Sequence, residues 1–245
     1  MIYRRTLFLA PLALLAAPAL AAPLLWVTAE VPPFVREGPQ GAEGYAHELF
    51  VRVHKQAGLH GELHFYPWAR AARMLLSGQA QGGLVVSRTP ERERKFQWLF
   101  PVGSFRFAIF TRAGDGAMAT DLAGLRERRV AVLRGSASSE LLNSVGMTGI
   151  DGKDYAELLA LLQRRVVDAI LAPEAVMLDQ LEHQKLAASS LHKTPLVQYS
   201  ELYAVAGPAM PEGVRERLSA AYRQLQDGGV VHQLRRRHPH SFIDG

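Results

Sequence analysis

The chain has 245 residues, of which 48% are hydrophobic, and its formal net charge is +5. A chain of this length can bury one large core or two smaller ones. It contains no cysteine, which excludes a disulfide framework, a thiolate nucleophile and a cysteine-ligated metal.

The first segment has the pattern of a secretory signal peptide. The short basic stretch MIYRR precedes the apolar run TLFLAPLALLAAPALAA, which ends in small residues. We expect residues 1–22 to form this peptide, with cleavage near Ala21 or Ala22. The run is too short and too interrupted by proline to span a membrane comfortably. The sequence therefore predicts an exported protein, and a bacterial periplasm fits best.

The net charge offers little support for binding to nucleic acid. Cleavage would remove Arg4 and Arg5 and no acidic residue, so two positive charges are lost and +3 remains. Much of that excess lies in QLRRRHPH near the C-terminus. Nucleic-acid binding requires a dense basic face with aromatic side chains. Because the chain is predicted to be exported, a solvated terminal helix explains this run better, and we expect no nucleic-acid partner.

After residue 23 the predicted strands and helices alternate. We expect strands at LLWVTAE, ELHFYPW and GGLVVS. Helical spacing favours helices at YAHELFVRVHKQAG and ARAARMLLSGQ, ending at Gly58 and Gly78. This βαβαβ order is typical of an α/β fold with parallel strands. A further helix is expected to begin at Pro90, with Thr89 as its cap.

A second α/β unit follows a long aromatic strand, SFRFAIFTRAG, and a polar loop. Its expected elements are the strand RRVAVLRG, the helices SSELLNSV and YAELLALLQRR, the strand VVDAILAP and the helix EAVMLDQLEH. LYAVAG is another strand, and two amphipathic helices end the chain. We expect FAIFTRAG and LYAVAG to cross between two lobes. Residues 23–110 are predicted to begin lobe 1, residues 111–200 to form lobe 2 and residues 201–245 to return to lobe 1, with a ligand cleft at the strand ends.

The stretch SRTPERERKF contains the most distinctive candidate for binding. Arg92 would lie in the first turn of the helix expected at Pro90, where the helix dipole already favours an anion. Its guanidinium fork, with the Ser87 hydroxyl nearby, would suit a carboxylate bound by two hydrogen bonds. The alternative is a solvated charged turn, which is the usual role of such runs. The residues alone leave both interpretations open.

Three further stretches offer binding groups. VLRGSASSELL places Ser136 and Ser138 at a strand-to-helix turn, where backbone N–H groups can form an anion-binding nest. Ordinary N-capping is the favoured interpretation of these serines taken alone, and a place opposite Arg92 across a cleft would favour anion binding. Trp68, in FYPWAR, could stack on a ligand, and Phe34, in VPPF, is a similar aromatic on a loop. For both aromatics the alternative is packing in the core.

Two acids could meet a cationic group of a ligand. Glu30 follows the first strand, and Glu174 follows DAILAP. The alternatives are a surface acid at Glu30 and, at Glu174, a helix N-terminal acid stabilised by the dipole. The chain has no Gly-x-Ser-x-Gly, His-Glu-x-x-His or EF-hand motif. We therefore expect no catalytic residues, no metal and no cofactor.

Together these motifs resemble family 3 of the periplasmic solute-binding proteins, which includes the polar amino-acid receptors of ABC transporters. The resemblance covers nearly the whole mature chain and, in its YPWARA…RTPERE pair, points to one branch. It rests on VPPF, YPWARA, SRTPERERKFQW, RRVAVLRGSASSE and VVDAILAP. It implies the type II fold of two α/β lobes, joined by two crossing strands and closing on the ligand. It also implies that Arg92 binds the ligand carboxylate with Ser87 and the Ser136–Ser138 turn, near Trp68.

The resemblance further implies what the protein would do. A monomer would capture a small carboxylate, either an amino acid or a derivative, and deliver it to a membrane permease. Where the amino-acid receptors usually hold an aspartate for the ammonium group, this chain has Pro173 followed by Glu174. Two other functions stay open: an enzyme resembling cyclohexadienyl dehydratases, with Glu174 as general acid, and a sensory or scaffold protein of the envelope.

Overall fold

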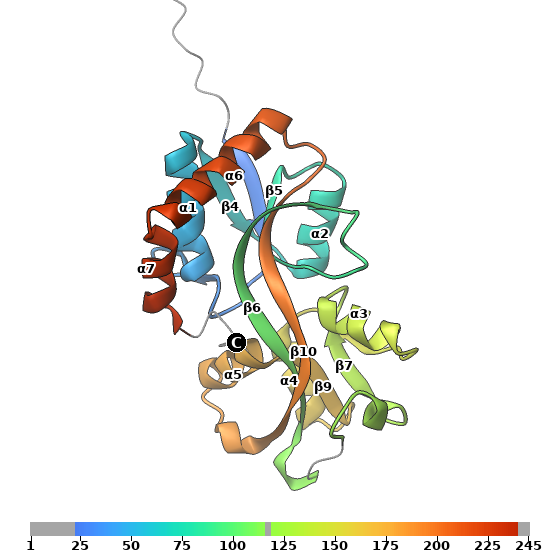
Figure 1. Ribbon diagram of the computed structural model, residues 1–245. Coiled ribbons are helices and arrows are strands. Elements are labelled where there is room, and N and C mark those ends of the chain that lie inside the picture. Colours follow the sequence, from blue (N-terminus) through green and yellow to red (C-terminus); the bar gives the residue numbers. More distant parts are fainter. Residues whose placement is uncertain (1–22, 116–118, 240–245) are drawn as a thin grey trace, which may run out of the picture.

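The computed structural model, which describes residues 23–115 and 119–239, has two α/β lobes joined by two long strands (Figure 1). The signal peptide predicted over residues 1–22 lies outside the described residues. One eight-stranded sheet, in the order β4-β1-β5-β10-β6-β9-β7-β8, runs through both lobes. It is continuous because β6 and β10 take part in each lobe.

Lobe 1 is built around parallel strands covered on both faces. Its sheet elements are β1 (Leu24–Thr28), β4 (Gly61–Phe65) and β5 (Gly82–Ser87), with the small hairpin β2 (Arg36–Gly38) and β3 (Gly41–Glu43) beside them. Its first helices are α1 (Tyr45–Ala57) and α2 (Trp68–Leu76). Strands β4, β1 and β5 pair in parallel, as the βαβαβ order predicts. Every residue of β5 is buried, which is typical of a strand covered by helices on both faces.

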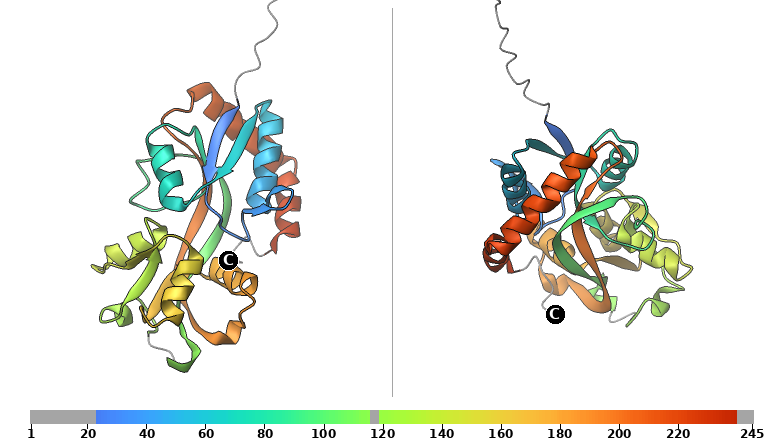
Figure 2. Two further views of the ribbon diagram at one scale, coloured as in Figure 1. Left: turned by 180° about the vertical axis from the view of Figure 1, so that it is seen from behind. Right: turned by 45° about the horizontal axis from the view of Figure 1, so that its top comes forward.

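The helices of lobe 1 end and pack as their sequence indicates. In α1, Leu49, Phe50 and Val53 lie on one buried face. Gly58 ends the helix in the left-handed conformation, at φ 62°, which glycine adopts without steric cost. The last helices, α6 (Glu212–Asp227) and α7 (Val230–Arg237), lie beside α1 on one side of the sheet, while α2 lies on the other (Figures 1 and 2).

Lobe 2 repeats the alternation on a smaller scale. Its elements are β7 (Val130–Leu133), α3 (Ala137–Ser144), β8 (Ile150–Gly152), α4 (Tyr155–Gln163), β9 (Ala169–Pro173) and α5 (Glu174–His183). Strand β7 pairs in parallel with β8 and with β9. The apolar side chains Phe110, Leu158 and Ile170 meet in the core of this lobe. The sequence predicts all of these elements except the short strand β8.

The two crossing strands are longer than their sequence patterns indicate. Strands β6 (Gln97–Arg112) and β10 (Leu191–Ala206) have 16 residues each and pair antiparallel. In lobe 1, β10 pairs with β5, and in lobe 2, β6 pairs with β9. LYAVAG predicts only the end of β10, because Pro195 and an irregularity in register between Pro195 and Tyr199 interrupt its alternation.

The helix expected to begin at Pro90 is absent, which corrects the sequence prediction. Residues 90–95 form successive turns, in which the Arg92 N–H donates to the Thr89 carbonyl at 3.0 Å and the Lys95 N–H donates to the Arg92 carbonyl at 2.9 Å. The cap and proline signals are present, but β6 begins at Gln97 and leaves too few residues for a stable helix. Arg92 is therefore held by side-chain contacts and not placed by a helix dipole.

Candidate ligand-binding site

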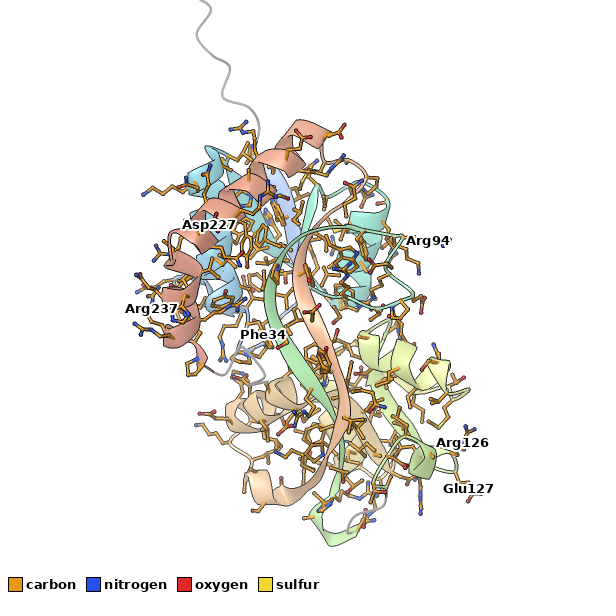
Figure 3. The ribbon with its side chains drawn as sticks, in the orientation of Figure 1. Phe34, Arg94, Arg126, Glu127, Asp227 and Arg237 are labelled. Atoms are coloured by element: carbon orange, nitrogen blue, oxygen red, sulfur yellow. The ribbon has the colours of Figure 1, made fainter. Side chains whose placement is uncertain are left out.

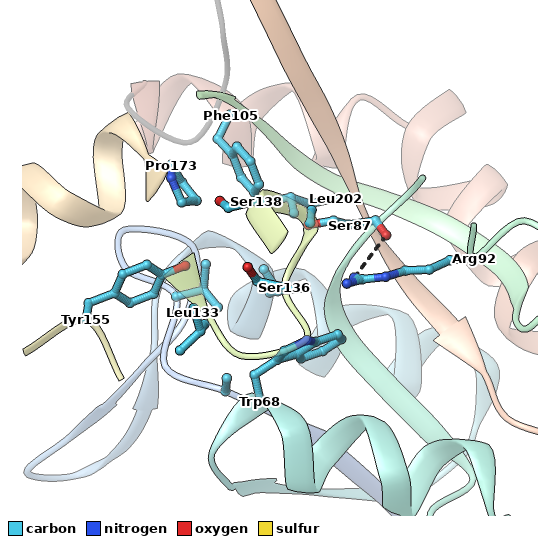
Figure 4. Close-up of a pocket in the computed structure, with 14 residues that line it drawn as sticks. Trp68, Ser87, Arg92, Phe105, Leu133, Ser136, Ser138, Tyr155, Pro173 and Leu202 are labelled. Atoms are coloured by element: carbon cyan, nitrogen blue, oxygen red, sulfur yellow. Dashed lines mark hydrogen bonds between the residues drawn. The ribbon is translucent and has the colours of Figure 1, made fainter. Parts of the chain in front are cut away.

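A cavity lies between the lobes, at the carboxyl ends of β1, β5, β7 and β9 (Figure 4). Its empty volume is about 420 Å³, which includes the part open to solvent. Lobe 1, lobe 2 and the crossing strands all contribute to its wall. The described lining residues are Ala29, Val31, Trp68, Val85, Ser87, Arg92, Phe105, Leu133, Ser136, Ala137, Ser138, Tyr155, Pro173 and Leu202. A cleft at strand ends is thus present where the sequence predicts one.

Arg92 crosses from lobe 1 to lobe 2 at one side of this cavity. The residue is only 4% exposed. Its Nε donates to Glu140 Oε1 at 2.8 Å, and its other donors reach the carbonyls of Gly135, at 3.0 Å, and Ser87, at 3.5 Å. The contact to Ser87 is too long to be a strong hydrogen bond. One edge of the guanidinium is therefore paired with an acid, while the Nη1 donor at the other edge is held only weakly.

Both carboxylate oxygens of Glu140 accept hydrogen bonds from lobe 1. Besides Arg92, it accepts a hydrogen bond from Thr89 Oγ1 at 2.7 Å. Trp68 adds a further contact between the lobes, because its Nε1 donates to the Gly135 carbonyl at 2.6 Å. The Trp68 ring also lies 4.9 Å from the Arg92 guanidinium carbon, so it stacks on this cation. We call Arg92, Thr89 and Glu140 the buried bridge.

A separate contact between the lobes lies on the opposite side of lobe 2. Arg36, in β2, forms an ion pair with Asp179, in α5. Helices α5 and α3 lie on opposite sides of lobe 2, so this pair is well separated from the buried bridge (Figures 1 and 2). We call Arg36 and Asp179 the exposed bridge. No sequence pattern predicts either bridge.

Several hydroxyl groups of the cavity have no hydrogen-bond partner among the described residues. Ser87 and Ser138 are 9% and 2% exposed, and neither side chain makes such a bond within the described chain. The same is true of the Tyr155 hydroxyl, whose pKa is raised by burial, so that it stays a neutral donor. Ser136 differs, because its Oγ accepts from the Ser139 N–H at 3.3 Å as the N-cap of α3. Figure 4 shows the Ser136 and Tyr155 oxygens directed into the space between the lobes.

The backbone of the cavity wall is strained at one position. Val85 has a φ of 60°, which is a costly conformation for a β-branched residue. It lies in β5, next to the register irregularity between Tyr203 and Val205 of β10. Strain of this kind costs about 1–3 kcal/mol and clusters at ligand sites. Its occurrence in the cavity wall agrees with the placement of the site there.

The structure brings five of the eight candidate residues to the cavity: Trp68, Ser87, Arg92, Ser136 and Ser138. Phe34 is fully buried in the core of lobe 1, where its carbonyl accepts from the Ala46 N–H. Glu30 is exposed and accepts from the Glu37 N–H, while Glu174 pairs with Lys193. These three are absent from the described lining, and Pro173 occupies the strand end nearest Glu174.

No sequence motif singles out three residues of the site: Phe105, Tyr155 and Glu140. The alternating aromatics of SFRFAIFTRAG indicate that one face of the strand is buried, but not which side chain reaches a cavity. Tyr155 and Glu140 each lie in the first turn of a helix, where they look like ordinary helix residues. Their roles depend on how the lobes meet, and short-range patterns carry no signal for that.

The described residues were also compared with the requirements of a membrane span and of a metal site. Within residues 23–115 and 119–239, no helix is long and apolar enough to cross a membrane. In the same part of the chain, the histidine, aspartate and glutamate side chains form no group of three or more that could hold a metal ion.

Comparison with known proteins places the fold. No protein-family model and no curated protein matches the sequence. A solved histidine kinase sensor domain with similarity to periplasmic binding proteins is 20% identical, with a TM-score of 0.79, over 89% of this chain and 96% of that one. The GluR0 ligand-binding core from Nostoc punctiforme, solved with L-glutamate, is 20% identical, with a TM-score of 0.73, over 88% and 99%.

A third solved structure is the arginine-, lysine- and histidine-binding protein ArtJ from Geobacillus stearothermophilus. It is 16% identical, with a TM-score of 0.75, and the match covers 88% of this chain and 94% of that one. The predicted fold class is therefore confirmed: this chain has the two-lobed periplasmic binding protein fold. At these identities the likeness carries the fold alone.

Proposed function

We propose that this chain is an exported solute-binding protein, similar to family 3, that captures a small carboxylate in the cavity between its lobes. The observation that carries the proposal is Arg92, a buried cation with a loosely held edge at the cavity. A guanidinium binds a carboxylate through two parallel hydrogen bonds. Because Glu140 takes the Nε side, the Nη1 side remains for a ligand.

The fold supports capture by closure. Each lobe supplies part of the cavity wall, and the two crossing strands are the main covalent link between the lobes. A ligand that contacts both lobes stabilises the closed arrangement over an open one, since only the closed arrangement offers all the contacts. We propose that the closed form delivers the ligand to a membrane permease of the ABC type, and that the protein acts as a monomer in the periplasm.

A sensory role is the second candidate, and the similarity to a histidine kinase sensor domain favours it. Capture of the ligand would be the same, and the partner that reads closure would differ. An enzyme of the dehydratase kind has less support. Glu174, its candidate general acid, pairs with Lys193 and is not among the described residues of the cavity.

A thermal-shift screen of the mature protein against amino acids, their derivatives and small carboxylates tests the proposal. A ligand that binds the folded state raises the melting temperature by mass action. We expect carboxylates to stabilise the wild type and to have no effect on the Arg92→Gln variant. Arg88→Gln is the matched control, because Arg88 lies in the same loop and pairs with Glu93 outside the cavity. Equal stabilisation of the Arg92→Gln variant would contradict the proposal.

A further inference from the structure

The charges around the cavity do not provide for a ligand ammonium group. Among the described lining residues, Arg92 is the one charged side chain. The acid closest to it, Glu140, already binds Arg92 through one oxygen and Thr89 through the other. An ammonium group taken out of water without an opposite charge costs several kcal/mol. The site therefore has a partner for a carboxylate and none free for an amine.

The other acids near the junction of the lobes lie outside the described lining of the cavity. Glu30, between the lining residues Ala29 and Val31, is exposed and accepts from the Glu37 N–H. Glu174 is bound to Lys193, and Asp179 is bound to Arg36. To bind a ligand ammonium group, Glu174 or Asp179 would have to break its ion pair with Lys193 or Arg36. At the strand end where a carboxylate would reach the cavity, the chain has Pro173, whose ring is apolar and whose nitrogen carries no hydrogen.

The described lining of the cavity contains neutral hydroxyl groups and no carboxylate. Ser87 comes from lobe 1, and Ser138 and Tyr155 come from lobe 2. All three line the cavity, and none has a hydrogen-bond partner among the described residues. A hydroxyl donates to a keto oxygen and both donates to and accepts from an alcohol. Each of these hydroxyls can therefore pair with a ligand oxygen without giving up a hydrogen bond to a described residue.

The rest of the wall suits a short apolar body. Apart from Ser136, it consists of hydrophobic side chains, among them Val31, Val85, Phe105, Leu133 and Leu202. Hydrocarbon placed against them gains from leaving water. The cavity thus combines one cation, several neutral hydroxyls and an apolar wall.

From this combination we infer that the cavity takes 2-hydroxy or 2-oxo acids with a short apolar chain and rejects the corresponding 2-amino acids. The inference rests on the proposed function, since it assumes that Arg92 binds the carboxylate. It narrows the ligand class by specifying the ligand's second polar group. That group is an oxygen at carbon 2, which would contact Ser87, Ser138 and Tyr155.

Calorimetric titration with matched probes tests the inference on the mature protein. One set shares a branched five-carbon skeleton: 2-oxo-3-methylbutanoate, 2-hydroxy-3-methylbutanoate and L-valine. The other set carries a phenyl group: 2-oxo-3-phenylpropanoate, 2-hydroxy-3-phenylpropanoate and L-phenylalanine. We expect the oxo or hydroxy acid of at least one set to bind about a hundredfold more tightly than its amino acid, because the ammonium group lacks a partner.

The outcomes separate the inference from the proposed function. Amino acids that bind as tightly as the oxo and hydroxy acids, and lose binding in the Arg92→Gln variant, would overturn the inference and leave the proposed function standing. Binding of an amino acid that is lost in Glu140→Gln would identify Glu140 as its ammonium partner and would also overturn the inference. If no probe binds, the inference fails and the thermal-shift screen decides the proposed function. If binding survives Arg92→Gln, both fail.

Two variants extend the test to individual positions. Tyr155→Phe removes one hydroxyl, and we expect it to weaken the oxo and hydroxy acids about tenfold. Pro173→Asp places a carboxylate at the cavity, at the N-cap of α5, where aspartate is favoured. We expect it to bind L-valine more tightly than the wild type does and the oxo acid less tightly. An unchanged preference in both folded variants would overturn the inference.

Discussion

The two bridges between the lobes have the same chemistry and very different surroundings. In the buried bridge, the side chains of Arg92 and Glu140 are 5% and 17% exposed, and Thr89 and the Gly135 carbonyl add hydrogen bonds. In the exposed bridge, the side chains of Arg36 and Asp179 are 40% and 21% exposed. Burial makes the loss of one partner costly, because the other charge stays unpaired away from water. The exposed bridge can therefore affect only how the lobes close. The buried bridge can also affect ligand binding, because Arg92 lines the cavity.

The largest effect should follow from Arg92→Gln, which breaks the buried bridge from the cation side. It leaves Glu140 buried without a counter-charge, and removing one partner of such a pair costs about 3–5 kcal/mol. We expect this loss in the free energy of unfolding, measured with urea, together with loss of carboxylate binding. A variant as stable as the wild type would show that the lobes do not depend on this contact.

Acid should destabilise lobe 1 at a site remote from both bridges. His54 is buried against Trp26 and Phe50, its Nδ1 bonds the Phe50 carbonyl, and its Nε2 has no partner among the described residues. Burial lowers its pKa from 6.5 to about 4. The unfolded chain therefore binds a proton first, so stability is complete above pH 6.5 and falls as the pH approaches 4.

The expected loss from His54 is about 3 kcal/mol between these two pH values. Urea unfolding of the wild type and of His54→Leu as a function of pH measures it. The variant should lose this part of the acid sensitivity. If both proteins show the same pH dependence, the acid sensitivity does not arise from His54.

Glu140→Gln breaks the buried bridge from the acid side and leaves Arg92 buried without a counter-charge, so we expect a cost at the lower end of the same range, about 3 kcal/mol. The amide oxygen can still accept from Thr89, and the Arg92 cation loses the acid that neutralises it. Carboxylate affinity in calorimetry should therefore rise. Weaker carboxylate binding would mean that Glu140 positions Arg92 for the ligand and does not compete with it.

Arg36→Gln breaks the exposed bridge and should have the smallest effect. A surface ion pair contributes about 0–1 kcal/mol. We expect an unfolding free energy close to that of the wild type and a carboxylate affinity within about threefold. A loss of unfolding free energy as large as that of Arg92→Gln would contradict the difference in stabilisation that we expect between the two bridges.

The same distinction explains how much of the site could be predicted. Ser87, Arg92, Ser136 and Ser138 follow strands that end at one edge of a sheet, so a local pattern locates them. Glu140 lies 48 positions from Arg92, and their contact depends on the closure of two lobes. Phe34, Glu30 and Glu174 have similar local patterns but other roles. Phe34 packs in the core, Glu30 accepts a hydrogen bond from the Glu37 N–H, and Glu174 pairs with Lys193.

The fold was more predictable than the site for a physical reason. Apolar periodicity and stop signals such as Gly58 act within one element, and most elements formed as expected. The predicted helix at Pro90 is wrong because β6 begins seven residues later, which no local signal indicates. The lengths of β6 and β10 also depend on partners, since each strand pairs in both lobes.

The central claim is that a carboxylate on Arg92 holds the lobes closed, and a distance between the lobes tests it most directly. The chain has no cysteine, so labels on Asp227→Cys and Arg126→Cys report on α6 of lobe 1 and the far end of lobe 2 (Figure 3). With spin labels at both sites, 2-oxo-3-methylbutanoate should narrow the distance distribution toward the closed arrangement. In the Arg92→Gln background the same addition should change nothing. A distribution that responds equally in both backgrounds would contradict the account.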